Sequence, residues 1–177
     1  MTDNELIGLF RPAIIAMLTA QGISADVIQS AQPTIQGAPS TNVVFFYKIS
    51  EGAEGVVGAS DTWDDDEQEM VHTETQVYST MFQVGALCPQ TASSTVTAPD
   101  VLRIVRMAIQ SPVFLRDLAT NHGVGILNIA NIRNTIITDD KNLFEASPSF
   151  DFTLTHKQVI ITTTPIVETV TARIERV

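Results

Sequence analysis

MVHTETQVYSTMFQVGAL, residues 70–87, is the stretch that decides the fold. Thr, Val and Tyr dominate it, and β-branched and aromatic residues favour the extended chain. Alternate residues of a strand point to the same side, so Tyr78, Phe82 and Val84 share one face. The stretch therefore predicts one long strand.

The segment before it predicts a partner strand and a projecting connection. VVFFYKI, residues 43–49, is β-branched and aromatic throughout, which is typical of a strand covered on both faces. Residues 50–69, SEGAEGVVGASDTWDDDEQE, contain three glycines and an acidic run. We expect this segment to form a protruding acidic hairpin loop or the tip of a long hairpin.

An amphipathic helix is predicted at the amino terminus. Thr2 and Glu5 have the spacing of a capping box, in which each side chain satisfies a backbone donor at the helix start. Apolar residues then recur at helical spacing until Gly22, which favours a helix end. Pro12 is expected to bend or split this helix, because it removes a backbone hydrogen bond. Residues 24–42, rich in Ser, Gln and Pro, predict a connecting loop.

Two further helices are predicted in the middle of the chain. Thr97 precedes APDVLRIVRMAIQ, residues 98–110, whose apolar residues form a stripe, with proline and aspartate in the first turn. Ser111 and Pro112 then begin a shorter helix that ends at Gly123. We expect a central helix pair.

The remainder predicts three strands, at residues 124–134, 150–164 and 166–177, with a loop at 135–149. In the second of these, apolar and polar residues alternate until the phase shifts at residues 159–161. A bulge or burial on both faces would explain that shift. The element order predicts an α+β fold in one domain, 1–177: a mostly antiparallel β-sheet with the N-terminal helix and the helix pair on one face.

Composition excludes several classes of function. The formal net charge is −10, which disfavours gripping the phosphate backbone of nucleic acid, although DNA could still pass an acidic wall. No apolar run approaches the ~20 residues of a membrane span, so we expect a soluble protein that folds in a cytoplasm. Cys88 is the only cysteine, so no intrachain disulfide forms, and no basic neighbour marks it as a reactive thiol.

The acidic run DTWDDDEQE, residues 61–69, has three interpretations. Its carboxylates could form a Ca²⁺-binding module, but the spacing of an EF-hand fails, because the sixth residue from Asp61 is Asp66 and not glycine. It could be a solvated charged loop, or it could contact a partner. Trp63 supports a partner contact, because tryptophan often dominates interfaces. The candidate contact residues are Asp61, Trp63, Asp64, Asp65, Asp66 and Glu67, and the same acids would form the Ca²⁺ site.

No motif predicts catalysis or a cofactor. His72, His122 and His156 are isolated in the sequence and form no metal-ligand spacing. The glycines of GAEGVVG match neither a P-loop nor a dinucleotide fingerprint, and no GxSxG elbow is present. A hydrolase would need one of the histidines to meet a carboxylate and a hydroxyl in a cleft. We expect a protein that is not an enzyme and holds no cofactor and no metal.

A family resemblance emerges from residues 25–49, ADVIQSAQPTIQGAPSTNVVFFYKI. A short amphipathic helix, a VI pair, a Gln- and Pro-rich loop and an apolar strand, in this order, resemble the neck and tail-terminator (tail-completion) proteins of tailed bacteriophages. The helix introduced by APD and the terminal strands agree in order. The residues carried over lie in the loop, at Gln32, Pro33, Gln36 and Pro39, although the asparagine usual beside glutamine in the family is missing.

The resemblance implies a structural virion protein of the tail or neck, made in the host cytoplasm. It implies an α+β subunit of a homo-oligomeric ring, commonly a hexamer, that caps the tail tube. The partners implied are other copies of the chain, the tail tube protein and the head-tail connector, with DNA as passive cargo in the lumen and no membrane. The contact residues then include Gln32 and Gln36 with the acidic run.

Overall fold

The computed structural model describes residues 1–29, 40–89, 95–138 and 144–165. These residues form three helices and a six-stranded sheet. Gln32 and Gln36, and the strand expected at residues 166–177, lie outside the described residues.

Three long strands make the centre of the sheet. They are β2 (Val43–Asp64), β3 (Glu69–Leu87) and β6 (Phe144–Pro165). β3 lies between the other two and is antiparallel to both. Short strands complete the edges: β1 (Asp26–Gln29) pairs parallel with β2, while β4 (Gly125–Ile129) and β5 (Arg133–Thr138) pair antiparallel with β6.

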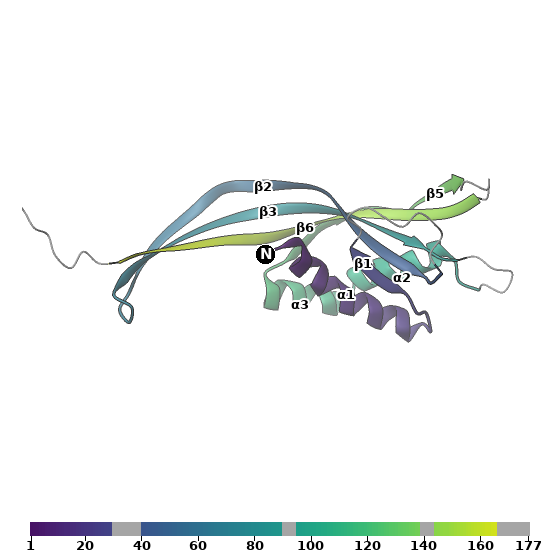
Figure 1. Cartoon of the computed structure of the whole chain (residues 1–177), viewed down its shortest axis with the longest axis horizontal. Coiled ribbons are helices and arrows are strands. Elements are labelled where there is room, and N and C mark those ends of the chain that lie inside the picture. Colours follow the sequence, from purple (N-terminus) through teal and green to yellow (C-terminus); the bar gives the residue numbers. More distant parts are fainter. Residues whose placement is uncertain (30–39, 90–94, 139–143, 166–177) are drawn as a thin grey trace, which may run out of the picture.

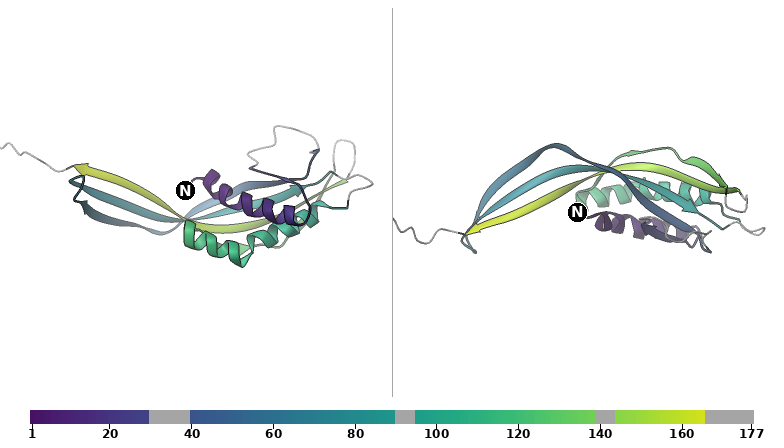
Figure 2. Two further views of the ribbon diagram at one scale, coloured as in Figure 1. Left: turned by 90° about the horizontal axis from the view of Figure 1, so that it is seen from below. Right: turned by 45° about the horizontal axis from the view of Figure 1, so that its top comes forward.

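Helices cover only part of this sheet. α1 (Asp3–Ala20), α2 (Ala98–Ile109) and α3 (Pro112–His122) pack together on one face of one half, as Figures 1 and 2 show. The other half of the three long strands projects beyond them. The α+β prediction is therefore confirmed, including the mostly antiparallel sheet and the helices on one face. No helix among the described residues is both long and apolar enough to cross a bilayer.

A cluster of phenylalanines joins the helices to the sheet. The ring of Phe152 on β6 lies 5.2 Å from that of Phe10 on α1 and 5.8 Å from that of Phe82 on β3. Phe46 on β2 meets the same ring edge-on at 6.2 Å. All four side chains are almost completely buried. Because each ring comes from a different element, this cluster fixes the helical layer on the sheet.

Several predicted boundaries were wrong. Residues 50–64 continue β2, and the connection to β3 is a turn at 65–68, so of the two expectations the loop is wrong and the long hairpin is what the structure has. The loop expected at 24–42 contains β1, and the loop expected at 135–149 contains part of β5 and the start of β6. Cross-strand hydrogen bonding overrides the weak local preference of these Gly-, Ser- and Asp-rich segments.

The helix ends follow the sequence signals. Thr2 Oγ1 accepts a hydrogen bond from the Glu5 amide at 3.3 Å, and the Glu5 carboxylate accepts one from the Thr2 amide at 2.6 Å. Gly123 ends α3 in the left-handed conformation, with φ of 63°. α1 nevertheless runs unbroken past Pro12, so the predicted split does not occur. Burial of the apolar face of α1 offsets the missing hydrogen bond.

We predict that Phe152→Ala lowers the free energy of unfolding by about 3–5 kcal/mol, because it removes the ring shared by both layers. Chemical denaturation followed by circular dichroism measures this. Leu127→Ala is the control, since Leu127 on β4 is 64% exposed and its loss should cost far less. Equal losses in the two variants would contradict the assigned core.

Candidate functional site: the uncovered arm

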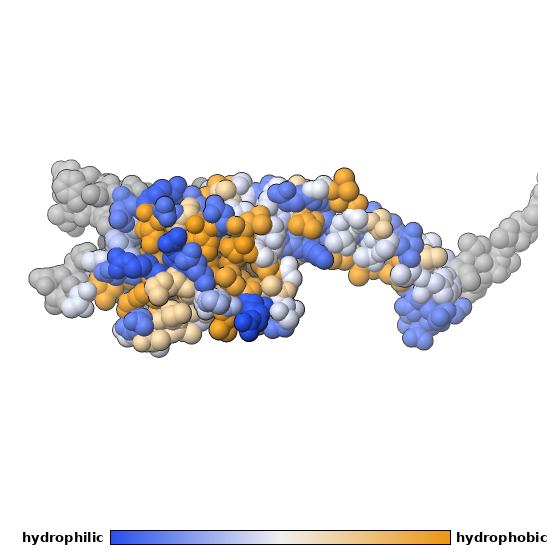
Figure 3. Space-filling view, turned by 180° about the vertical axis from the view of Figure 1, so that it is seen from behind, coloured by the Kyte–Doolittle hydropathy of each residue, from blue (hydrophilic) through white to orange (hydrophobic). Residues whose placement is uncertain are grey.

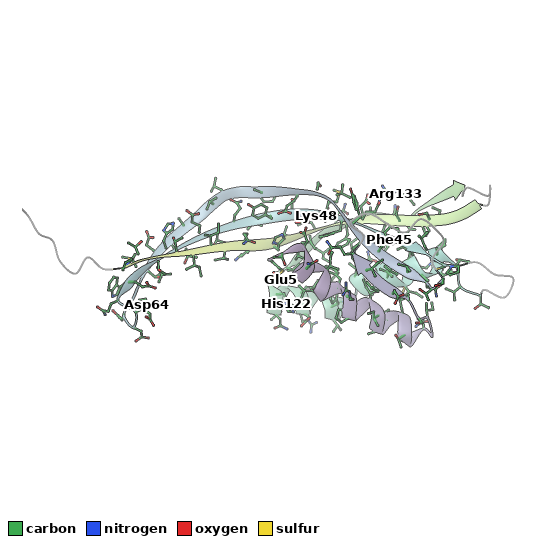
Figure 4. All side chains as sticks on the ribbon, viewed as in Figure 1. Glu5, Phe45, Lys48, Asp64, His122 and Arg133 are labelled. Atoms are coloured by element: carbon green, nitrogen blue, oxygen red, sulfur yellow. The ribbon has the colours of Figure 1, made fainter. Side chains whose placement is uncertain are left out.

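The uncovered half of the sheet is the candidate site. We call it the arm and define it as residues 50–80, which hold the outer parts of β2 and β3, together with residues 156–165 of β6. Figure 4 places Lys48 where the arm leaves the helical body and Asp64 at its far end. Beyond its base, the arm is a three-stranded ribbon without helices on either face (Figure 1).

Polar contacts hold the base of the arm against α1. The Lys48 ammonium lies 2.9 Å from the Asp3 carboxylate and also pairs with Glu51. Burial opposes the charge of Lys48, but its hydrogen bonds to Glu51 and Asp3 outweigh this and raise its pKa. The terminal amine of Met1 donates to Gln158 Oε1 on β6 at 2.7 Å. The start of α1 therefore touches both outer strands where the arm begins.

A buried histidine lies at the same level. His156 on β6 is 4% exposed, and its Nε2 lies 3.2 Å from Thr80 Oγ1 on β3, which is fully buried. The ring of Tyr78 stacks on the imidazole. Burial lowers the pKa of His156, and the positive amino terminus lowers it further. A neutral histidine therefore closes the end of the core.

Midway along the arm, β2 departs from regular pairing with β3. The register shifts between Glu54 and Gly58, and Gly55 has φ of 72°. The side chains of two β3 residues bond to Glu54: Gln76 Nε2 donates to its carbonyl at 2.8 Å, and Ser79 Oγ to its carboxylate at 2.7 Å. Such a bulge bends the strand and strengthens its twist.

Nearer the tip, an imidazole lies between two carboxylates. His72 Nδ1 is 2.6 Å from Asp61 Oδ1 on β2, and its Nε2 is 3.3 Å from Glu74 Oε1 on β3. The hydrogen bond with Asp61, then that with Glu74, raises the pKa of His72. The three side chains are 37 to 63% exposed, so this cluster is not a buried catalytic pair.

The tip of the arm is the turn at residues 65–68, which the side chain of Asp64, one of the predicted contact residues, stabilises. Asp64 Oδ1 accepts from the amides of Asp66 and Glu67 at 3.0 and 3.2 Å, so its carboxylate is engaged in the turn. Gln68 adopts φ of 54°, and its side-chain Nε2 donates to the Asp65 carbonyl at 2.8 Å. Within the described part of the chain, no group of three or more His, Cys, Asp or Glu side chains could hold a metal ion. No observation therefore favours the Ca²⁺ interpretation.

The arm exposes large apolar side chains on both of its faces. Trp63 is 43% exposed, and the consecutive residues Val159, Ile160 and Ile161 are 46, 55 and 62% exposed. Pairing of β3 with β6 shows no register shift from Glu69–Pro165 to Gly85–Ser149. The expected bulge at residues 159–161 is therefore absent, and within one chain the expected burial is absent too.

The arm also carries most of the net charge. It holds nine acidic residues and one basic residue, Lys157, so it contributes −8 to the total of −10. Figure 3 shows hydrophilic side chains gathered at the tip, and apolar ones mixed with polar ones along the shaft. The acidic residues are Glu51, Glu54, Asp61, Asp64, Asp65, Asp66, Glu67, Glu69 and Glu74.

The structure thus brings most of the predicted contact residues together at the outer end of β2 and the turn after it: Asp61, Trp63, Asp64, Asp65, Asp66 and Glu67. The sequence analysis did not count residues 159–161 among the candidate contact residues, although β6 places them on the same arm. The signal for them in the sequence was the shift in the alternation of apolar and polar residues.

The histidines form no hydrolytic site among the described residues: His122 lies near Asp117 at 3.9 Å, and His156 meets a hydroxyl but no carboxylate.

We predict that His72 titrates with a midpoint above 6.5, because protonation charges it between two carboxylates. Its stabilising effect is full below about pH 6.5 and is lost as the pH rises through the raised pKa. NMR titration of the ring measures the midpoint. Asp61→Asn should lower the midpoint more than the matched Glu74→Gln, since Asp61 contributes most. A midpoint unchanged by Asp61→Asn would refute this assignment.

His156 should have the opposite pH dependence. Its lowered pKa means that the unfolded chain binds a proton first, so stability is full above about pH 6.5 and falls as the pH drops toward the folded pKa. Thermal unfolding between pH 7.5 and 5.5 measures this. The variant His156→Gln keeps a polar partner for Thr80. Its melting temperature should fall less between pH 7.5 and 5.5 than that of wild type. Identical slopes in both proteins would contradict the prediction.

Comparison with known proteins identifies the family. The family model described as E217 gateway protein gp29 matches residues 5–166. No curated protein sequence gives a significant match.

Among solved structures, the chain is similar to the sheath/tube terminator of PVC, an extracellular contractile injection system, in its extended state. The identity is 14%, the TM-score is 0.44, and the match covers 96% of this chain and 63% of the other. The chain thus spans less than two thirds of that terminator's length. The match of the family model to most of the sequence shows that this chain belongs to the family of the E217 gateway protein gp29, a family of structural phage proteins.

Proposed function

We propose that the chain is one subunit of a homo-oligomeric ring, a hexamer, that caps the tail tube and joins it to the head-tail connector. The observation that carries this proposal is the arm, which leaves apolar side chains of Trp63 and residues 159–161 uncovered in a single copy. Exposed apolar groups that lie together mark interaction sites. Membership of a family of structural phage proteins supports neighbours of the same particle as the partners.

The shape of the subunit suits a ring. The arm and the helical body are different surfaces at opposite ends of the molecule (Figure 1). A contact between unlike surfaces is heterologous, and heterologous contacts close into a ring when the rotation permits. One kind of contact, repeated in every copy, therefore suffices for assembly.

The charge of the arm suits a channel. In a ring with arms at the lumen, each copy contributes −8 to the channel wall. Such a wall repels the phosphates of DNA, so the genome passes without adhering. DNA is then passive cargo, and the chain needs no base-reading element.

The tip of the arm is the proposed contact with a neighbouring protein of the particle. Asp65, Asp66 and Glu67 make no ion pair within the described ranges, and Trp63 lies directly before the turn. A partner with basic groups around an apolar hollow would satisfy both features. Gln32 and Gln36 join this site by family resemblance. The assembled protein is located in the virion, after synthesis in the host cytoplasm.

The oligomeric state tests the proposal. Light scattering should give about six times the 19.2 kDa of one chain, either for the purified protein or once the tail tube protein and the connector are added. Electron microscopy of the same sample should show closed rings at tube ends. A monomer under every one of these conditions would refute the ring.

Trp63→Ala should weaken binding to the tail partner by roughly thirtyfold in Kd, the effect of losing a hot spot of about 2 kcal/mol. Calorimetric titration or surface binding with the tail tube protein and with the connector measures it. Val113→Ala is the control, because Val113 is 76% exposed on α3 and lies far from the tip. Unchanged affinity of Trp63→Ala for both partners would exclude the tip as the contact.

A further inference from the structure

Among the described residues, no strand pairs with either outer edge of the arm. β1 pairs with β2 only at residues 43–46, so the outer edge of β2 is open from Tyr47 to its end at Asp64. β4 and β5 pair with β6 only at residues 144–155, so β6 is open from His156 to Pro165. An open edge presents a row of N–H and C=O groups to which another strand can add.

The two edges differ in charge. The open edge of β6, residues 156–165, has no acidic residue and one lysine, Lys157. The open edge of β2, residues 47–64, has four acidic residues and one basic residue, Lys48, which pairs with Asp3 and Glu51 of its own chain. Two β2 edges would repel each other, and two β6 edges would bring lysine toward lysine. Only the unlike pair, β6 with β2, brings opposite charges together.

The two edges also differ in regularity. β6 keeps register with β3 along the whole arm and carries Val159, Ile160 and Ile161 in succession. Natural edge strands are usually blunted by bulges or charges, and this segment has neither, apart from Lys157. Its composition is that of a central strand with neighbours on both sides. Its position in a single copy is nevertheless an edge.

We propose that the outer edge of β6 in one copy pairs with the outer edge of β2 in the next copy, so that the arms join into one continuous sheet around the ring. This inference rests on the ring put forward above. Both β2 and β6 are antiparallel to β3, so they run in the same direction. Between neighbours whose arms point the same way, the new pairing is therefore parallel.

The β2 strand has the curvature that a closed sheet of arms requires. A sheet closes on itself only when it curves, and bulges with glycines supply that curvature. β2 has register shifts at Lys48/Ser50 and Glu54/Gly58, and glycines at 52, 55 and 58. Figure 1 shows it bowed along the arm. Beyond the second shift, Gly58 to Asp64 pair regularly with β3 and offer a seven-residue edge for β6 of the next copy.

Blocking one edge at a time tests this pairing. Ile161→Glu places an acid on the β6 edge, against the acidic β2. For the β2 edge, Ala59→Pro and Ser60→Pro are both made, because adjacent amides point to opposite sides of a strand and one of the two faces outward. The proline variant that keeps the circular dichroism and melting temperature of wild type is used. Leu127→Glu is the control, since Leu127 is as exposed as Ile161 but lies on β4 in the body.

The expected result has two parts, both read by light scattering. Each blocked variant alone loses the ring and falls about sixfold in mass, whereas Leu127→Glu keeps it. Mixing the two blocked variants in equal amounts, tenfold above the concentration at which wild type assembles, gives a complex of two chains, because each supplies the edge that the other lacks. If wild type assembles only on tail tubes, every sample contains them.

Other outcomes are decisive. Rings that persist in both blocked variants overturn the edge pairing while leaving the ring intact. Loss of the ring in one variant alone indicates pairing of like edges, and failure of the mixed pair to associate indicates that a strand of another protein occupies the edge. Either result overturns the inference. A wild type that is monomeric in every sample instead refutes the ring itself.

Discussion

The uninterrupted pairing of β3 with β6 joins the helical body and the arm into one sheet. It continues without a register shift from Glu69–Pro165 at the tip to Gly85–Ser149 in the body. Cross-strand partners share a face, so the face that holds Phe82 and Phe152 in the core continues outward to His72 and Ile160. The same two strands therefore build both the hydrophobic core and the arm.

Helical cover decides which part of this sheet is a core. Where the three helices lie, the inward side chains are buried in contact with Phe10 and the apolar stripe of α2. Beyond the amino-terminal end of α1, β3 carries His72, Glu74 and Gln76 on the same face. The buried pair Thr80 and His156 lies at the boundary. The ion pair of Asp3 with Lys48 and the hydrogen bond from the Met1 amine to Gln158 fix the start of the arm at that boundary. The hydrophobic core therefore lies in the body, and the outer arm contributes little to it.

A structural phage protein needs surfaces for assembly more than it needs chemistry. The arm concentrates charge, an exposed tryptophan and two open strand edges in a segment that contributes little to the core of its own chain. Apolar groups on both faces of an edge strand are unfavourable in an isolated subunit. In the proposed ring, neighbouring copies would cover these groups, which would link the stability of the arm to assembly.

Much of this protein could be predicted from its sequence, because local patterns set local structure. The capping residues Thr2 and Glu5, the stop at Gly123, the long strand from Met70 and the α+β order all follow from short-range periodicity. The acidic run around Trp63 was also recognisable as a projecting feature. Only the tertiary structure decided that Gly- and Asp-rich residues 50–64 form a strand, because β3 beside them satisfies their backbone groups. It alone also showed that residues 159–161 lie uncovered at an edge, because burial depends on which elements are neighbours in space and not on the order of residues in the chain.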